Sequence, residues 1–282
     1  MEIEQKRRRK LLDEGCEKLN LSRSLPNLNT RYTGHLIVDN EYKILFNFIP
    51  KVSCKTWKSV FGELRRTHSN RGKSLLSAYS EEEQQYRLAN YRKAVFVREP
   101  ITRLLSMYLS KFCNFRNLQR IWERMYGRKI VAQYRNGFTP YSPKNNDTGP
   151  LSFLNITLSE FIQFLTDREG QINLGYITDH FLPLNIVSSP CAIHYDFIGH
   201  YENLTTEAPY MLKFFGANHA VQYPPVHASS AVNRLVNEYK KVPLDLMKRL
   251  RKYYRNDYEL FGYSFDDTLK SIVETFFSED DE

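Results

Sequence analysis

The sequence contains no long hydrophobic run, and this absence sets the first limit on what the protein can be. No stretch of its 282 residues approaches the ~20 apolar residues that cross a bilayer. The chain opens with a charged segment, whereas a secretory signal peptide has a short apolar core. We therefore expect no membrane span in this chain.

Cysteine is scarce, and the four residues present do not have the spacing of a metal site. Cys16, Cys54, Cys113 and Cys191 form no C-x-x-C pair and have no nearby histidine at metal-ligand spacing. The sequence also has no acidic metal-binding cluster, so we expect no bound metal. Four cysteines are compatible with reduced thiols or with one or two disulfides, and the count alone does not decide.

Two signatures of nucleotide and nucleic-acid binding are missing as well. The chain lacks the triphosphate-binding loop G-x-x-x-x-G-K-[ST], and it has no recognised nucleic-acid-binding motif. It does carry an excess of positive charge, with a formal net charge of +8. This charge favours an anionic partner, such as nucleic acid, acidic polysaccharide, lipid head groups or a nucleotide, and does not choose among them.

Apolar runs and helical patterns alternate along the chain. Hydrophobic residues make up 41% of the sequence and aromatic residues 14%, which is enough for a sizeable core. The patterns predict buried strands at 43–49, 93–97 and 194–199, and helices at 1–19, 54–66, from Pro100, and at 157–167, 206–215 and 243–257. We therefore expect an α/β fold with a central, mainly parallel sheet flanked by helices.

Two short segments carry most of the chemical information. Residues 46–58 read FNFIPKVSCKTWK, and residues 95–106 read VFVREPITRLLS. In each, an apolar strand breaks into a basic, hydroxyl-bearing turn that leads into a helix. A helix N-terminus has backbone donors without intrahelical partners and a partial positive charge, so it attracts anions. Two such units in succession predict a ligand with two separate anionic ends.

Each segment taken alone also has an ordinary structural explanation. Lys51, Ser53 and Thr56 form a phosphate or sulfate cradle if their turn closes on an anion, but they also fit a solvated turn and a helix cap. Arg98 and Ser106 hold one phosphate only if the serine, almost two turns into its helix, reaches back towards the strand end. Otherwise the arginine pairs with the neighbouring glutamate, and the serine is a helix contact.

Together, the order and spacing of the two segments resemble the Golgi carbohydrate sulfotransferases of the HNK-1 and chondroitin 4-O-sulfotransferase group. Further stretches match in family order, namely YGRKIVAQYR at 126–135, FIQFL at 161–165, HFLP at 180–183, PCAIHYDFIG at 190–199 and YELFGY at 258–263. The resemblance covers roughly residues 10–263 and implies a P-loop-like sulfotransferase fold. It further implies a stem-like helix at 1–30, a catalytic domain at 31–265, and a C-terminal helix with an acidic tail at 266–282.

The resemblance also implies which residues bind the donor, 3′-phosphoadenosine 5′-phosphosulfate (PAPS). Lys51 falls on the family lysine that lies against the bridging oxygen, where negative charge develops as the sulfuryl group leaves. Arg98 and Ser106 fall on the family's ligands for the 3′-phosphate. Because a sulfuryl group has fewer charges to neutralise than a phosphoryl group, its transfer depends less on a metal ion. The loop for the 5′-phosphosulfate comprises Lys51, Val52, Ser53, Cys54, Lys55 and Thr56.

The acceptor hydroxyl needs a base, and several residues are candidates. His180 is the first, because the family carries a His-aromatic-x-Pro element here, although a structural histidine at a turn fits the same pattern. Glu63, on the helix after the loop, is the second candidate, and a solvent-facing charge is its ordinary explanation. His68 and His200 are weaker candidates.

The chain departs from the family in several places. Relatives tend to carry cysteines at the positions of Asn47 and Ser188, so we hypothesise that they have a disulfide which this protein lacks. Family members are type II Golgi membrane proteins, so we expect a lumenal Golgi protein that begins where the stem of its relatives ends. Four N-glycosylation triplets give weak support to the secretory route, at Asn20, Asn146, Asn155 and Asn203.

The sequence thus predicts a PAPS-dependent sulfotransferase that acts on a glycan hydroxyl. The expected partners are PAPS and a glycosaminoglycan or glycoprotein glycan, and the expected target is O-4 of N-acetylgalactosamine in chondroitin or dermatan. We expect residues 136–152 to form a surface loop that helps to select the acceptor. One alternative is an inactive relative that binds acidic glycans. Another, favoured only by the basic balance, is a nucleic-acid-binding protein.

Overall fold

The computed structural model describes residues 1–24, 33–68, 72–113, 122–137, 154–167, 179–227 and 229–279. Its contacts divide the chain into two compact units. The division into 1–30, 31–265 and 266–282 drawn from the sequence is of a different kind and stays a prediction. The first unit comprises Met1–Arg103, Tyr176–Ala228 and Tyr254–Ser264, and the second comprises Leu104–Gly175, Ser229–Tyr253 and Phe265–Glu282.

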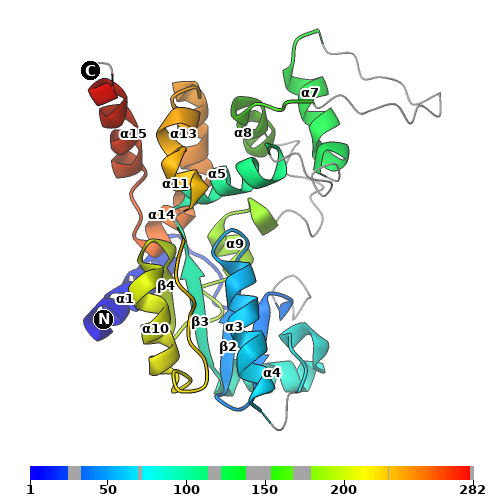
Figure 1. Ribbon diagram of the computed structural model, residues 1–282, viewed down its shortest axis with the longest axis vertical. Helices are drawn as coiled ribbons and strands as arrows, with labels where there is room; N and C mark the ends of the chain where they lie inside the picture. Colours follow the sequence, from blue (N-terminus) through cyan, green and yellow to red (C-terminus); the bar gives the residue numbers. More distant parts are fainter. Residues whose placement is uncertain are drawn as a thin grey trace, which may run out of the picture. The chain divides into compact units, whose positions relative to one another are not determined.

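The first unit is built on a four-stranded sheet in the order β1-β2-β3-β4 (Figure 1). The strands are β1 (Leu36–Asp39), β2 (Ile44–Asn47), β3 (Arg92–Val97) and β4 (Phe197–His200). The pairs β2–β3 and β3–β4 are parallel, and β1 pairs antiparallel with β2. The predicted α/β fold with a mainly parallel sheet flanked by helices is therefore confirmed.

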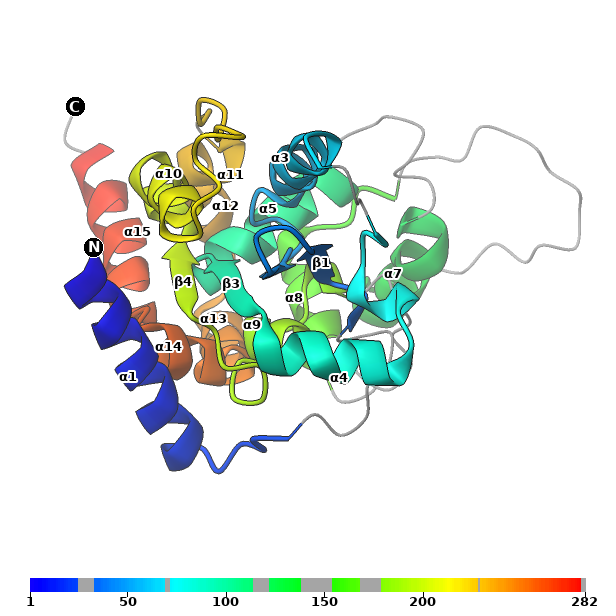
Figure 2. The ribbon, with the colours of Figure 1, turned by 90° about the horizontal axis from the view of Figure 1, so that it is seen from below.

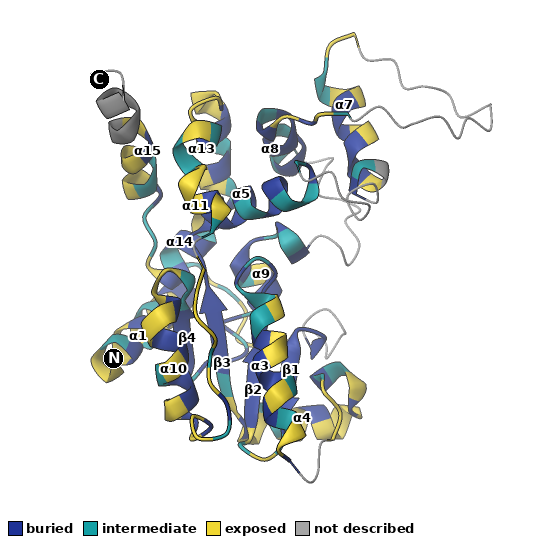
Figure 3. Cartoon of the chain, in the orientation of Figure 1, coloured by how far each residue is buried: buried dark blue, intermediate teal, exposed yellow. Residues whose placement is uncertain are grey.

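Helices cover both faces of this sheet. Figure 2 shows α3 (Cys54–Arg66) and α10 (Leu204–Phe214) on one face, and α1 (Glu2–Lys18) and α14 (Arg255–Phe261) on the other. The predicted helix at 54–66 is confirmed, and its apolar stripe of Trp57, Val60, Phe61 and Leu64 is buried. Figure 3 shows that α3 has both buried and exposed residues. The ring of Trp57 packs against Phe46 at 4.6 Å and Phe96 at 4.9 Å, so aromatic side chains join α3 to the sheet. The unit also contains η1 (Leu76–Ala78), α4 (Glu81–Asn90), α9 (Leu184–Ser188) and η5 (Tyr201–Asn203).

The second unit is helical in the part of the chain that is described. Helix α8 begins with the predicted capping box, in which Thr157 and Glu160 satisfy each other's backbone N–H groups. Arg135 at the end of α7 donates to both carboxylate oxygens of Glu160, at 2.7 and 2.8 Å. The unit contains most of α5 (Pro100–Lys111), η2 (Glu123–Gly127), α7 (Arg128–Tyr134), α8 (Leu158–Thr166), α11 (Ser230–Asn233), α12 (Leu235–Tyr239), α13 (Leu244–Tyr253) and α15 (Phe265–Glu279).

Several predicted boundaries were wrong. The strand predicted at 194–199 begins only at Phe197, because residues 194–196 are irregular. The Asp196 carboxylate accepts a hydrogen bond from the Lys93 N–H at 2.7 Å. The helix predicted at 243–257 is two helices, α13 and α14, which meet at the fully buried Tyr254. Strand β1 was not predicted at all. Most of the loop expected at 136–152, with Asn146, lies outside the described residues, as does the end of the acidic tail.

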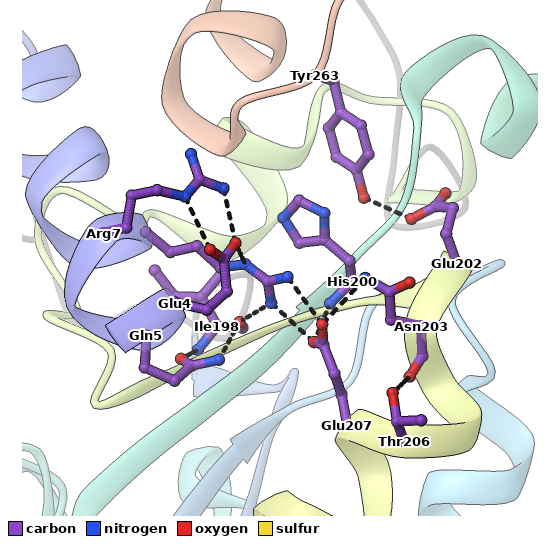
Figure 4. A network of polar contacts seen from close by, with 11 residues as sticks. Glu4, Gln5, Arg7, Ile198, His200, Glu202, Asn203, Thr206, Glu207 and Tyr263 are labelled. Carbon is purple, nitrogen blue, oxygen red and sulfur yellow. Dashed lines mark hydrogen bonds and ion pairs between the residues drawn. The ribbon is translucent and has the colours of Figure 1, made fainter. Parts of the chain in front are cut away.

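Helix α1 is held to the first unit by a disulfide and by a buried polar network. Cys16 is bonded to Cys191, while Cys54 and Cys113 are free thiols. Figure 4 shows the network, in which Gln5 exchanges two hydrogen bonds with the backbone of Ile198 on β4. The Arg8 guanidinium forms a bidentate ion pair with Glu207 at 2.7 Å, and both side chains are buried. Helix α1 therefore covers the open edge of β4.

Asn47 and Ser188 lie on either side of one buried tyrosine. The Asn47 amide donates to the Tyr195 hydroxyl at 2.7 Å, and this hydroxyl donates to the Ser188 carbonyl at 2.7 Å. Burial raises the pKa of Tyr195 far above its usual value, so the hydroxyl stays protonated as a donor. The two positions share a hydrogen-bonded bridge in this protein, and a disulfide at these positions in relatives stays a hypothesis.

Candidate anion-binding site at the carboxyl edge of the sheet

The predicted donor residues follow the ends of neighbouring parallel strands. In the sheet register, Asn47 of β2 lies beside Val95 of β3, and Val97 lies beside His200 of β4. Lys51 follows the end of β2, and Arg98 comes directly after β3. Ligands of open α/β sheets bind at this carboxyl edge, where loops from adjacent strands converge.

The turn before α3 has the backbone geometry of an anion-binding loop. Lys51 and Ser53 both adopt positive φ angles, 69° and 55°, which non-glycine residues rarely do. Left-handed residues within a turn direct successive N–H groups into a concave surface that suits an anion. Ser53 is the N-cap residue of α3, yet its side chain makes no capping hydrogen bond. The first-turn donors of α3 therefore have no cap from this side chain, as an anion site requires.

A tyrosine that sequence reasoning missed covers this loop. The Tyr223 hydroxyl lies 2.6 Å from the Ser53 hydroxyl, and it also interacts with Thr56. Its ring packs on Trp57 at 4.5 Å. Tyr223 belongs to a segment without helix or strand pattern, so only the fold brings it to the loop. It fixes the positions of the two hydroxyls that were predicted to face the donor.

The remaining loop residues have distinct environments. Val52 is 1% exposed and its N–H donates to the Ile49 carbonyl, so its side chain anchors the turn in the core. Cys54 is half-buried, while Lys55 is exposed on the first turn of α3.

Arg98 is buried beneath the same loop. Its Nη1 donates to the Lys51 carbonyl at 3.1 Å, and its guanidinium stacks on the Tyr201 ring at 4.1 Å. Only 2% of the residue is exposed, and burial lowers its pKa although nearby acidic groups favour the charge. The arginine remains charged at neutral pH, because an unperturbed guanidinium loses its proton only far above it. The predicted sulfate loop and the predicted phosphate arginine are thus joined directly.

Glu99 modifies the prediction for the second segment. Its carboxylate accepts from the Thr102 N–H at 2.7 Å and from the Ile101 N–H at 3.3 Å, so it caps the start of α5. The Tyr258 hydroxyl also donates to it, at 2.9 Å. The backbone donors at this helix start are therefore taken by an internal carboxylate. An anion here would be bound by side chains rather than by the helix N-terminus.

Arg103 connects the donor loop to the segment that carries His180. Its Nε donates to the Pro50 carbonyl at 3.1 Å, directly before Lys51 in the chain. Its Nη2 and Nη1 donate to the carbonyls of Asp179 and Leu182, each at 2.7 Å. The residue is 1% exposed. One guanidinium therefore fixes both segments, a role that its place in the sequence motif does not reveal.

His180 lies half-buried in a short turn whose neighbours are tightly held. The Asp179 carboxylate lies 2.8 Å from Nε2 of His35, and the other ring nitrogen of His35 lies 3.1 Å from the Phe48 carbonyl. Both members of this pair are about 3% exposed. The side chain and the carbonyl of Asp179 thus fix the backbone next to His180. The role of His180 as a base stays a prediction.

The other predicted residues are less directly placed. Ser106 belongs to the second unit, so its part in binding a phosphate with Arg98 stays a prediction. Glu63 is exposed on α3, about 13 Å along the helix from its start. His68 pairs with Asp39, which lies beside the first residue of β2 and hence at the opposite edge of the sheet.

His200 is the last residue of β4 and lies at the carboxyl edge of the sheet, where its side chain is a buried, neutral group. Its ring stacks on Tyr263 at 4.7 Å, and its Nε2 is buried without a hydrogen-bond partner among the described residues. Burial lowers the pKa of His200 to about 4.

Within the described ranges, no group of three His, Cys, Asp or Glu residues is arranged to hold a metal ion. None of the helices in those ranges is long and apolar enough to cross a membrane.

Comparison with known proteins agrees with this geometry. The sequence profile of the sulfotransferase family matches residues 34–264, which include both anion segments and the His180 turn. The chain belongs to the sulfotransferase family. No solved structure gave a significant match to it.

Several individual relatives of this chain have names that describe carbohydrate sulfotransferases. Carbohydrate sulfotransferase 14 of Danio rerio is 32% identical over 247 residues, which cover 83% of this chain and 63% of the relative. Carbohydrate sulfotransferase 11 of Rattus norvegicus is 27% identical over 284 residues, covering 95% and 78%. Carbohydrate sulfotransferase 8 of Mus musculus is 26% identical over 279 residues, covering 92% and 64%. The chain spans slightly less than two thirds of the sulfotransferase 14 relatives.

Proposed function

We propose that this chain transfers a sulfuryl group from PAPS to a hydroxyl of a chondroitin- or dermatan-type glycan, at O-4 of N-acetylgalactosamine. The observation that carries the proposal is the junction of Lys51 and Arg98 at one edge of the sheet, through the hydrogen bond from Arg98 to the Lys51 carbonyl. Two cationic residues on adjacent strand ends match a donor with two anionic groups. The names of the relatives, carbohydrate sulfotransferases 14, 11 and 8, support a glycan as the acceptor.

In this proposal the 5′-phosphosulfate lies in the turn before α3. The N–H groups and hydroxyls of residues 53–56 surround the sulfate oxygens, while the buried Val52 anchors the turn. Lys51 lies against the oxygen that bridges sulfur and phosphorus. Arg98 and Ser106 hold the 3′-phosphate. Both anionic ends are then fixed before reaction, so positioning and charge stabilisation provide most of the rate enhancement.

The reaction is an in-line displacement at sulfur. The acceptor oxygen forms a bond to sulfur while the bond from sulfur to the bridging phosphate oxygen breaks, and 3′-phosphoadenosine 5′-phosphate (PAP) leaves. His180 takes the proton of the acceptor hydroxyl, and Lys51 stabilises the charge that develops on the departing phosphate oxygen. The balanced products are a sulfated glycan, PAP and one proton.

We also propose a lumenal location in the secretory pathway, as for Golgi enzymes of this kind. The bond between Cys16 and Cys191 supports this, because disulfides persist in oxidising compartments and are rare in reducing ones. Of the N-glycosylation triplets, Asn20, Asn155 and Asn203 lie in the described part of the chain.

Two variants test the donor site. Lys51→Ala should lower kcat for sulfate transfer by at least about 10²-fold, with a smaller effect on PAP affinity. Arg98→Ala should instead weaken PAP binding by about 10- to 100-fold, since it removes a charge-assisted contact to a phosphate. Calorimetric titration with PAP and initial-rate kinetics separate the two effects. A folded wild-type protein that does not bind PAP, or wild-type kinetics in both variants, contradicts the assignment.

A further inference from the structure

A groove in the first unit runs along α3 beyond the donor loop. Its volume is about 510 Å³. One wall is helix α3, and the other comprises Ile37 of β1 and the residues that precede η1. The lining residues are Ile37, Lys58, Phe61, Gly62, Arg65, Arg66, Ser74 and Leu75.

The floor of the groove is apolar and its rim is cationic. Phe61 and Ile37 are 1% and 4% exposed, so they form a closed base. Lys58 and Arg66 are exposed on the helix above them, and none of the described residues that line the groove is acidic. Nη2 of Arg65 donates to a backbone carbonyl at 2.8 Å, while its Nη1 is buried without a hydrogen-bond partner among the described residues. A concave site of this composition suits a ligand that has both apolar surface and negative charge.

We propose that this groove binds an acidic glycan chain and holds a part of the acceptor polymer that does not react. Sugar rings offer apolar faces to the floor, and their carboxylates and sulfates match guanidinium groups, which bind such anions in a bidentate manner. Lys58 lies two residues beyond Thr56 of the donor loop, and Arg66 lies about 12 Å further along the helix axis. A polymer that reacts near the loop would therefore extend into the groove. This inference rests on the proposed function and names a second contact for its substrate.

The groove predicts a dependence on acceptor length. The double variant R65Q/R66Q should raise KM for polymeric desulfated dermatan by about three- to tenfold, since each exposed charge pair contributes a factor of about two to three. Its kcat, its KM for a tetrasaccharide of the same glycan and its affinity for PAP should stay as in the wild type. The variant K6Q/K10Q is the matched control, because it removes the same charge from α1, where both side chains are more than 60% exposed. The polymer KM of the control should not change.

Several outcomes would overturn the inference. An unchanged polymer KM in R65Q/R66Q does so, and so does an equal rise for polymer and tetrasaccharide, which would place the arginines at the reacting sugar. If the double variant does not fold, R66Q alone is decisive, because the Arg66 side chain is exposed and forms no hydrogen bond or ion pair with the described residues. Binding of immobilised chondroitin sulfate separates the groove from the proposed function. If the wild-type protein binds the polymer through the groove but transfers no sulfate, the groove inference is supported and the proposed enzymatic function is refuted.

Discussion

Replacing Arg103 with lysine should lower both the stability of the fold and the rate of catalysis. The guanidinium donates to three carbonyls, those of Pro50, Asp179 and Leu182, and it is almost completely buried. A lysine ammonium cannot reach carbonyls on two separate segments in the same planar arrangement. At roughly 1.5–3 kcal/mol for a hydrogen bond to a charged group, the loss of one or two bonds should cost about 2–5 kcal/mol of unfolding free energy.

The catalytic effect arises because Arg103 fixes Lys51 and His180 relative to each other. A misplacement of about 1 Å between reacting groups can lower a rate by about 10²-fold. We therefore expect R103K to lower kcat by about 10- to 100-fold under conditions where the protein is fully folded. PAP affinity should fall by less than this, because Arg98 remains in place.

Arg92 provides the matched control. It donates to the carbonyls of Phe214 and Phe215 at 3.0 and 3.1 Å, but at the beginning of β3, at the opposite edge of the sheet. R92K should therefore lose stability without a change in kcat. Thermal unfolding, PAP titration and initial rates should be measured on both variants. A wild-type kcat in R103K, or an equal loss of kcat in R92K, would refute the positioning role of Arg103.

Three further predictions concern the cysteines, His200 and Tyr223. In denaturant without reductant, a thiol reagent should modify two cysteines, and after reduction it should modify four. Four reactive thiols without reduction would contradict the pairing. Loss of the Cys16–Cys191 bond should lower the unfolding free energy by about 2–5 kcal/mol. Burial lowers the pKa of His200 from 6.5 to about 4, so the unfolded chain binds a proton that the folded chain does not between these pH values. The unfolding free energy should fall by up to about 3 kcal/mol as the pH drops through this window, and His200→Gln should remove this part of the dependence, as urea titrations at several pH values will show. Tyr223→Phe should keep the ring contact with Trp57 but release the hydroxyls of Ser53 and Thr56, so KM for PAPS should rise by about two- to tenfold. An unchanged KM would mean that Tyr223 only packs against Trp57 and does not position the loop.

The sequence was informative where local pattern and function coincide. The strand ends that lead to Lys51 and Arg98 could be predicted because an apolar run followed by a basic turn and a helical stripe is a local signal. The same holds for α3 and for the capping box of α8. The residue composition of the two segments predicted a ligand with two anionic ends, and their register in the sheet is compatible with this.

Other parts of the site depend on contacts between distant segments. Tyr223 reaches the donor loop across 170 residues of sequence, and Asp179 reaches His35 across 144. No periodicity reports such pairs, because they result from packing rather than from local geometry. Strand β1 was missed because all four of its residues are buried, so it shows no alternation, and it lies outside the strand–turn–helix units that marked β2 and β3. Glu99 was considered as a partner for Arg98, while its actual contacts cap α5.

Transfer of labelled sulfate from PAPS to desulfated dermatan tests the central claim most directly, provided that the product is analysed as disaccharides. The folded protein should incorporate label at O-4 of N-acetylgalactosamine, and the Lys51→Ala variant should give only background incorporation. Binding of PAP without transfer to any glycan would contradict the claim and favour an inactive relative. Equal incorporation by the wild type and Lys51→Ala would show that the loop before α3 does not carry the reaction.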